Sequence, residues 1–407
     1  GIIRMSENLR WVYNRQYHLQ ENLEQGKDIL QKFTVEQVNC VERFHHTYEN
    51  FEKTPIHDLD ALAMHLGVSK IFVKDESYRF GLNAFKVLGG IYAIGKYIAK
   101  LLDQNIDELS FEQLKLPEVK EKLGDCTFIS TTDGNHGRGV AWAARELGCK
   151  ARIYMPAGSA EERLQNIKNE GAYAEITSMN YDETVRYTSQ LAKDNGWIVI
   201  QDTMWEGYEE IPLWIMQGYT TLAKEIVDHL QEAPTHVFLQ AGVGSFAGAI
   251  VAFLQQYYGQ QLTFVLIEPD AANCFYESFN RGTGQFVTVG GEMQTIMAGL
   301  ACGEPNPIAW DILKTYTKVS ISCSERVAAT GMRVLGNPLG ADNRIVAGES
   351  GAAPFGCFYE LMTNEDYYDL KVALQLNPKS KILFVSTEGD TDVENYRNIV
   401  WHGKYAK

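Results

Sequence analysis

One lysine in this sequence combines a reactive side chain with a protected position. Lys86 lies in the segment 81–90, shortly after an apolar run, 71–73, that is typical of a buried strand. We expect a helix to begin at Lys86, where aromatic and small neighbours would shield the amine from water. Burial disfavours the charged ammonium and favours the neutral amine, which can attack an aldehyde. The sequence therefore predicts a nucleophilic lysine, with an ordinary surface lysine at a helix start as the alternative.

Two glycine-containing loops are candidates for binding an anion. Residues 130–139 read Ser-Thr-Thr-Asp-Gly-Asn-His-Gly-Arg-Gly, between a predicted strand and a helix predicted at 140–147. Thr132 or Asp133 could cap this helix, whose first N–H groups can hold an anion. Residues 240–248, Gln-Ala-Gly-Val-Gly-Ser-Phe-Ala-Gly, also join a predicted strand to a helix. Their glycines allow backbone N–H groups to approach a phosphate closely.

Further polar segments follow at 295–301, 348–352 and 385–392. The stretch 389–392, Gly-Asp-Thr-Asp, is similar to part of a calcium loop, but it lacks the EF-hand spacing. The seven cysteines are scattered and have no CxxC spacing. We therefore expect no bound metal.

Strands and helices are expected to alternate along the chain. Short apolar runs rich in Ile, Val and Phe predict strands at 126–131, 151–155, 197–201, 236–240, 263–268 and 381–386. Helical periodicity fills the stretches between them, which predicts an α/β fold with a mostly parallel sheet. In such sheets ligands bind at the carboxyl ends of the strands, where the candidate loops lie. Residues 1–50 show polar helical patterns and are interpreted as an extension that wraps the body.

Bulk properties narrow the class of protein. The 407 residues suffice for two domains, and 45% hydrophobic with 22% charged residues is ordinary for a globular protein. A net charge of −15 argues against nucleic acid as a partner. No apolar run is long enough for a membrane span, and the start lacks a signal-peptide core. Cysteine usage indicates the cytoplasm. Cys274 and Cys302 are expected to be free thiols, with a disulfide between them as the alternative.

Taken in order, these motifs resemble pyridoxal-phosphate enzymes of the tryptophan-synthase-β type, fold type II. Four motifs carry this resemblance to threonine and serine deaminases. Ala84-Phe85-Lys86 is similar to their Ser-Phe-Lys, and Asp133-Gly134-Asn135-His136 is similar to their Ser/Ala-Gly-Asn-His. Residues 242–245 are similar to their glycine-rich phosphate loop, and Ser386-Thr387-Glu388-Gly389-Asp390 is similar to the strand end that meets the pyridine nitrogen. This implies two domains built on open twisted sheets with helices on both faces. The large domain would comprise 1–107 and 210–407, and the small domain 108–209.

A closer resemblance is to diaminopropionate ammonia-lyases, and it extends from about Thr54 to Trp401. It rests on residues 80–86, 131–139, 201–203, 205–208 and 386–392. The resemblance implies elimination of ammonia from D- and L-2,3-diaminopropionate, which yields pyruvate and two ammonia. It also implies a homodimer.

The resemblance assigns roles to individual residues. Lys86 would bind pyridoxal 5′-phosphate covalently and, after its release by substrate, act as a base. The other assignments are Gly242, Val243, Gly244 and Ser245 for the phosphate; Asn135 for the ring hydroxyl; Ser386 or Thr387 for the pyridine nitrogen; and Thr131, Thr132, Asp133 and Gly134 for the substrate carboxylate.

Asp133 departs from the deaminases, which have a small residue there. One interpretation is that Asp133 caps the helix, in which case its role is structural. Together with Asp202, from a second predicted strand end, it would select a diamine by charge and serve as a base opposite Lys86.

Two other functions fit parts of the sequence. A serine/threonine dehydratase or amino-acid racemase would use the same scaffold, but the Asp133 and Asp202 pair argues against it. An NAD(P)-dependent oxidoreductase would use 242–248 as a dinucleotide loop, with Glu268 twenty residues after Gly248 on the ribose. That interpretation leaves Lys86 without a purpose.

Overall fold

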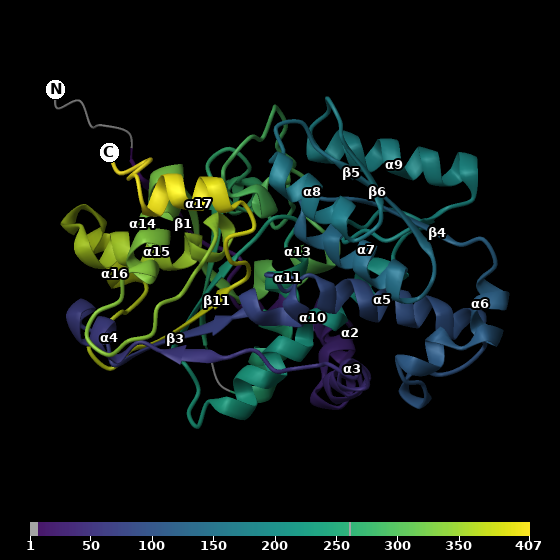
Figure 1. The fold of residues 1–407 in the computed structure, drawn as a ribbon. Coiled ribbons are helices and arrows are strands. Elements are labelled where there is room, and N and C mark those ends of the chain that lie inside the picture. The colour runs from purple at the N-terminus through teal and green to yellow at the C-terminus, as the bar shows by residue number, and fades with distance from the viewer. Residues whose placement is uncertain (1–6, 260–261) are drawn as a thin grey trace.

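Two β-sheets form the framework of the molecule (Figure 1). The computed structural model describes residues 7–259 and 262–407. Within them the larger sheet has seven strands in the order β1-β10-β9-β8-β11-β3-β2, and the smaller has four in the order β6-β5-β4-β7. The strands are β1 (Leu9–Tyr13), β2 (Ile56–Asp58), β3 (Lys70–Asp75), β4 (Thr127–Thr131), β5 (Lys150–Met155), β6 (Tyr173–Ile176), β7 (Ile198–Val199), β8 (His236–Gln240), β9 (Thr263–Pro269), β10 (Thr317–Cys323) and β11 (Lys381–Ser386).

Helices separate most of these strands. They are α1 (Gln20–Gln25), α2 (Lys27–Leu30), α3 (Val35–His46), α4 (Asp60–Leu66), α5 (Val87–Leu101), α6 (Pro117–Leu123), α7 (Asn135–Glu146), α8 (Glu161–Asn169), α9 (Tyr181–Asn195), α10 (Glu210–His229), α11 (Ser245–Tyr258), α12 (Cys274–Arg281), α13 (Pro307–Tyr316), α14 (Glu325–Gly336), α15 (Glu349–Thr363), α16 (Tyr368–Ala373) and α17 (Val393–Val400). Short 3₁₀ helices include η2 (Glu76–Gly81) and η5 (Ala298–Leu300).

The larger sheet is covered on both faces. Its inner strands β10, β9, β8, β11 and β3 are parallel, whereas the edge strands β1 and β2 are antiparallel to their neighbours. Because side chains alternate along a strand, Val237 and Leu239 of β8 pack with α5, α10 and α11, while Phe238 packs with α15 on the other face. Two covered faces explain why β3, β8, β9 and β11 each contain a continuous apolar run. The helices α14 to α17 gather at one end of the molecule, opposite β4 to β6 (Figure 1).

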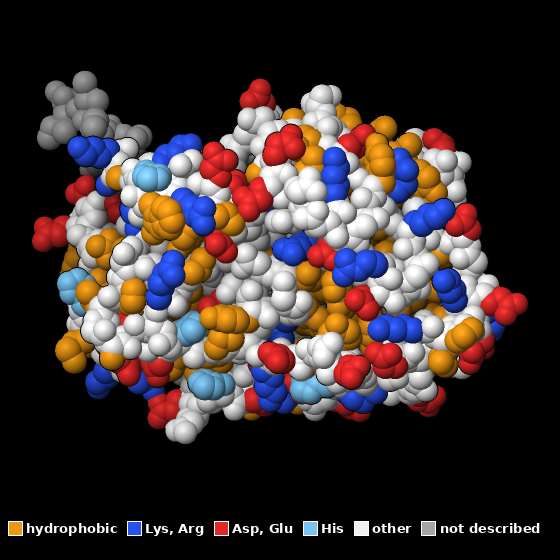
Figure 2. Space-filling view, in the orientation of Figure 1, with side chains coloured by type: hydrophobic (Ala, Val, Ile, Leu, Met, Phe, Trp, Pro, Cys, Tyr) orange, Lys and Arg blue, Asp and Glu red, His pale blue; other side chains and the backbone are white. Residues whose placement is uncertain are grey.

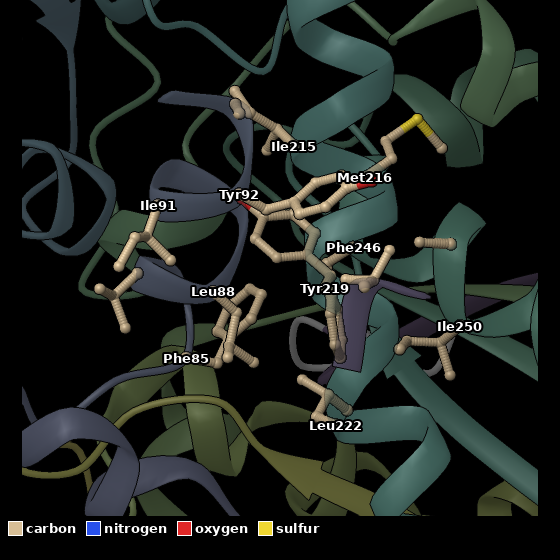
Figure 3. Close-up of a cluster of buried hydrophobic side chains, with 14 of the residues drawn as sticks. Phe85, Leu88, Ile91, Tyr92, Ile215, Met216, Tyr219, Leu222, Phe246 and Ile250 are labelled. Carbon is tan, nitrogen blue, oxygen red and sulfur yellow. The ribbon is translucent and has the colours of Figure 1, made fainter. Parts of the chain in front are cut away.

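The segment that carries Lys86 is fixed by aromatic packing. Figure 3 shows Phe85 among side chains of α5, α10 and α11. The ring of Phe85 lies 4.8 Å from that of Tyr219 and 4.7 Å from that of Phe246, between ring centroids. Phe85 is only 4% exposed. Burial of this ring anchors the backbone next to Lys86, just before α5 begins.

Helices α5 and α7 connect the two sheets at close range. Gly139 of α7 faces Val87, the first residue of α5, and a Cβ at Gly139 would lie 2.8 Å from the Cα of Val87. Only a glycine permits this approach. The contact brings the loop that precedes α7 next to Lys86.

Most predicted strands are confirmed, with corrections at the ends. The predicted strand 197–201 contains only the two residues of β7, and the helix predicted at 140–147 begins earlier, at Asn135. The helical prediction for 1–50 is confirmed for α1 to α3 but is wrong for β1, which pairs with β10 and buries Leu9. Residues 1–6 of that prediction lie outside the described residues. The strands of the smaller sheet all lie between 127 and 199; the domain boundaries at 108 and 209 stay a prediction.

The surface carries charges of both signs. On the face in Figure 2, acidic and basic side chains are intermixed rather than gathered by sign. Of the helices in 7–259 and 262–407, none combines the length and apolarity needed to cross a bilayer.

Two buried helical glycines at the junction of α5 and α7 should respond differently to alanine. A Cβ at Gly139 would press on the backbone of Val87, whereas a Cβ at Gly90 would lie 3.7 Å from Val140, an ordinary contact. We expect Gly139→Ala to destabilise the fold by about 1–3 kcal/mol through overpacking. Gly90→Ala should be neutral or stabilising by up to about 1 kcal/mol, because alanine favours helix. Urea unfolding of both variants measures the difference, and equal effects would contradict the assigned close approach.

Candidate active site

A cavity lies at the carboxyl ends of β4, β8 and β11, where both sheets contribute loops. Its lining contains most of the residues expected from the sequence: Lys86, Thr131, Asp133, Asn135, Asp202, Gly242, Val243, Gly244, Ser245 and Thr387. It also contains residues to which the sequence assigned no role in the site, including Tyr181, Tyr219, Gln240, Gly299, Cys302 and Ser350. Three predicted residues are outside this lining: Thr132, Gly134 and Ser386.

An ion pair between Lys86 and Asp133 crosses the cavity. Nζ of Lys86, the residue before α5, donates to Oδ1 of Asp133, in the loop before α7, over 3.2 Å. Burial alone would lower the pKa of Lys86, but the negative charges of Asp133 and Asp202 outweigh it and raise that pKa well above its ordinary value. The prediction of a neutral amine is therefore wrong for Lys86 beside these carboxylates.

Asp133 does not cap α7. That task falls to Thr132, whose Oγ1 accepts hydrogen bonds from the N–H groups of Gly134 at 2.9 Å and Gly137 at 2.8 Å. Thr132 is thus a structural residue of the loop. The side chain of Asp133 is free to face Lys86, and despite its burial the charges of Lys86 and Arg163 hold its pKa below the ordinary value. Asp133 is a carboxylate at neutral pH.

Asp202 reaches the same cavity from beyond β7. Its backbone oxygen accepts hydrogen bonds from Ser245 Oγ at 3.0 Å and Asn306 Nδ2 at 3.2 Å. Its Oδ1 accepts from the hydroxyl of Tyr181 at 3.2 Å. Burial first, and then the charge of Asp202, raise the pKa of Tyr181 well above its usual value, so that this hydroxyl remains a donor. Asp202 is consequently fixed in place by residues at the starts of three helices, α9, α11 and α13.

The loop 242–245 provides a compact anion site. Gly244 has a φ of +93° and immediately precedes α11, whose first N–H groups have no partner within the helix. A Cβ at Gly242 would lie 3.0 Å from the oxygen of Gly299, and one at Gly244 would lie 2.5 Å from the ring of Phe275. The absence of side chains at both glycines leaves the backbone N–H groups accessible to a phosphate.

Asn135 is held by an acidic side chain that sequence reasoning did not assign a role. Its Nδ2 donates to Oε2 of Glu388 over 2.7 Å. Arg163 of α8 bridges to Glu349 of α15 at 2.9 Å and approaches Glu388 at 3.8 Å. Arg163 Nε also donates to Thr391 Oγ1 at 3.0 Å. This network, Asn135, Arg163, Glu349, Glu388 and Thr391, ties the α7 and α8 side of the cavity to the α15 and β11 side.

The two hydroxyls after β11 differ in position. Thr387 lines the cavity, and its Oγ1 accepts a hydrogen bond from Gln240 Nε2 at 3.1 Å. Ser386 Oγ donates to the backbone oxygen of Glu388 over 3.4 Å. The geometry therefore favours Thr387 over Ser386 as a ligand contact. His136 Nε2 donates to the backbone oxygen of Ile200 over 2.8 Å, which agrees with an orienting role.

The cavity fits pyridoxal phosphate on the evidence of its polar atoms. An amine, a glycine-lined anion site and a hydroxyl at a strand end face one space. Asp133 Oδ2, Gln240 Oε1 and Ser350 Oγ are buried without hydrogen-bond partners among the described residues. Buried polar groups normally have partners, so these atoms indicate a place for a polar ligand.

The alternative interpretation, in which Glu268 binds the ribose of a dinucleotide, is wrong. Both of its oxygens are occupied at the start of α12, where they accept the N–H groups of Phe275 at 2.9 Å and Tyr276 at 2.7 Å. Glu268 is fully buried, so it cannot bind a ribose there. The neighbouring Cys274 and Cys302 are both buried and form no disulfide in this structure, and their redox state stays a prediction.

The fold and the cavity define a class of enzyme, and comparison with known proteins supports it. A model of the family described as "Pyridoxal-phosphate dependent enzyme" matches residues 48–388, so the chain belongs to that family. It is 52% identical over 378 residues to diaminopropionate ammonia-lyase of Escherichia coli (strain K12), covering 92% of this chain and 94% of the relative. The chain is thus a member of the diaminopropionate ammonia-lyase family.

Solved structures of a relative have the same fold. A crystal structure of the Escherichia coli enzyme in complex with D-serine matches with a TM-score of 0.89 at 47% identity and covers 98% of each chain. Another, in complex with an aminoacrylate-PLP azomethine reaction intermediate, matches with a TM-score of 0.88 at 47% identity, again over 98% of each chain. The fold-type-II prediction is therefore confirmed.

The ionic network predicts a pH-dependent stability. Burial raises the pKa of Glu349 to about 7 from 4.5, with the repulsion of Glu388 adding to it and Arg163 opposing it. Since the folded-state pKa is raised, Glu349 stabilises the fold below about pH 4.5, and this contribution is lost as the pH rises through about 7. Glu349→Gln should remove this loss, so the melting temperature of the variant relative to wild type should rise between about pH 5 and about pH 8.

The exposed Glu365 offers a control for that measurement. Glu365→Gln should leave the difference from wild type constant over the same pH interval. A flat difference for Glu349→Gln as well would show that Glu349 keeps one charge state throughout the interval.

Proposed function

We propose that this protein catalyses the α,β-elimination of ammonia from 2,3-diaminopropionate, accepts both the D and L isomers, and yields pyruvate and two ammonia. The observation that carries the proposal is the facing pair of Lys86 and Asp133, 3.2 Å apart in the cavity. Membership in the lyase family and the reaction intermediate held by the Escherichia coli relative support elimination chemistry.

The residues of the cavity supply distinct contacts for the cofactor. Lys86 would anchor pyridoxal phosphate through its amine, and Gly242, Val243, Gly244 and Ser245 would hold the phosphate. When bound, the cofactor withdraws electrons from the substrate and acidifies the proton at Cα. Asn135, fixed by Glu388, would bind the ring hydroxyl, and Thr387 the pyridine nitrogen, with Ser386 behind it.

The acidic residues suit a diamine substrate. Asp133 and Asp202 place two carboxylates in one buried cavity, where an ammonium group is attracted more strongly than in water. The substrate carboxylate would lie at the N-terminus of α7, against N–H groups of the loop formed by Thr131, Thr132, Asp133 and Gly134. A substrate bound this way would present its β-ammonium to the carboxylates.

Asp133, and Lys86 once substrate has released its amine from the cofactor in the uncharged form, could each take a proton from Cα. A substrate carbon that displaces the direct contact between them would offer opposite faces to the amine and the carboxylate, so that each isomer would have its own base. Loss of the β-ammonium as neutral ammonia requires its C–N electron pair to leave with nitrogen, which is easiest while that nitrogen is protonated. The carboxylates favour this protonated form.

The organisation of the protein is proposed on separate grounds. We assign 108–209 to a small domain and 1–107 with 210–407 to a large one, since the strands of the smaller sheet all lie between 127 and 199. We also propose a homodimer, which exposed large apolar side chains such as Met64 and Trp401 support. We propose a cytoplasmic location because the seven cysteines are scattered along the sequence without CxxC spacing.

Substitution of Asp133 tests the assignment of bases. Asp133→Asn keeps the size of the side chain but removes its basicity, so kcat/KM for at least one isomer should fall by about 10²–10⁴-fold. Pyruvate release from D- and L-2,3-diaminopropionate measures the effect. Asp366→Asn, at an exposed position, is the control and should leave both rates unchanged. Full activity of Asp133→Asn on both isomers would exclude Asp133 as a base.

A further inference from the structure

Two of the cavity-wall oxygens that are unpaired among the described residues border the same glycine. Oδ2 of Asp133 and Oγ of Ser350 are buried and unpaired. A Cβ at Gly299 would lie 3.0 Å from Oδ2 and 3.2 Å from Oγ. Gly299, Asp133 and Ser350 all line the cavity that contains Lys86. The missing side chain of Gly299 therefore leaves space beside both oxygens.

The backbone of Ser350 is fixed from both sides. Its N–H donates to Glu388 Oε1 at 3.2 Å, and its carbonyl oxygen accepts from Gln240 Nε2 at 3.2 Å. The residue is 4% exposed and lies in the first turn of α15. With its backbone N–H and carbonyl oxygen both paired, the hydroxyl is the one polar group of Ser350 left to contact a ligand.

The two oxygens match a cation better than a hydroxyl. A carboxylate oxygen only accepts hydrogen bonds, and a serine hydroxyl can accept two. An ammonium group carries three donors and can satisfy both oxygens at once, whereas a substrate hydroxyl carries a single donor. Hydrogen bonds to charged groups are also stronger than those between neutral groups.

We propose that Ser350, together with Asp133 and across Gly299, forms the receptor for the β-ammonium group of the substrate. Ser350 is then a specificity-determining residue that favours a β-amino over a β-hydroxy amino acid. The inference rests on the proposed function, because it assumes a substrate with an ammonium group at Cβ. During elimination the two oxygens keep that nitrogen protonated until the C–N bond breaks and its electron pair leaves with ammonia.

Removal of the Ser350 hydroxyl tests this assignment in the holoenzyme. Ser350→Ala should lower kcat/KM for 2,3-diaminopropionate by about 10–100-fold, since one hydrogen bond to a charged group is lost. The inhibition constant of serine, in which a hydroxyl replaces the ammonium, should change by less than about 3-fold. The absorbance spectrum of the bound cofactor should stay the same, which separates a substrate contact from a cofactor contact.

Ser320→Ala is the matched control. Ser320 in β10 is also a buried serine with an unpaired hydroxyl, but it is outside the cavity lining. Ser320→Ala should change neither kcat/KM for 2,3-diaminopropionate nor the inhibition constant of serine. A second pair of variants substitutes two nearby glycines. Gly299→Ala should lower diaminopropionate turnover at least about 10-fold, because its methyl group fills the space beside the two oxygens. Gly290→Ala is the control and should leave turnover unchanged, because a Cβ at Gly290 would have no neighbour within 4 Å.

The outcomes distinguish failure of the role assigned to Ser350 from failure of the proposed function. Equal losses for diaminopropionate and serine in Ser350→Ala, or an altered cofactor spectrum, would overturn the role of Ser350 and leave the proposed function intact. Wild-type protein that turns over serine but not diaminopropionate would overturn the proposed function and this inference together.

Discussion

The buried contact between Lys86 and Asp133 is the interaction on which the site depends. The amine comes from the start of α5 on the larger sheet, and the carboxylate from the loop after β4 of the smaller sheet. Each is costly to bury alone, so each charge requires the other or a ligand that replaces it. The close packing of Gly139 on Val87 is what brings the two loops within reach. A shift of either helix would separate the reactive groups.

The remaining structure holds both sides of the cavity in register. Arg163 and Glu388 connect the loops of the two sheets, and Glu388 orients Asn135 through a bond of 2.7 Å. Such a network keeps polar side chains in defined positions within a buried space. The oxygens Asp133 Oδ2 and Ser350 Oγ are not part of this network: both are buried without a hydrogen-bond partner among the described residues and border the space beside Gly299.

Much of this site could be predicted from the sequence, for a physical reason. Lys86, Asn135 and the glycine loop at 242–245 lie where strands end and helices begin, so local pattern alone places them at one edge of a parallel sheet. Ser350 could not be found this way, because a single serine in a helix faces a ligand only through tertiary packing. The charge of Lys86 was also beyond local pattern, since it depends on two carboxylates from distant segments. The strand β1 was missed because only Leu9 of its five residues is buried.

All of the proposed chemistry requires that the amine of Lys86 be the group that binds the cofactor. Borohydride reduction of the purified holoenzyme, followed by protease digestion and mass spectrometry, tests this directly. The account predicts a pyridoxyl adduct on the peptide that contains Lys86, with other lysines unmodified. An adduct on a different lysine, or none on a protein that remains active, would contradict it.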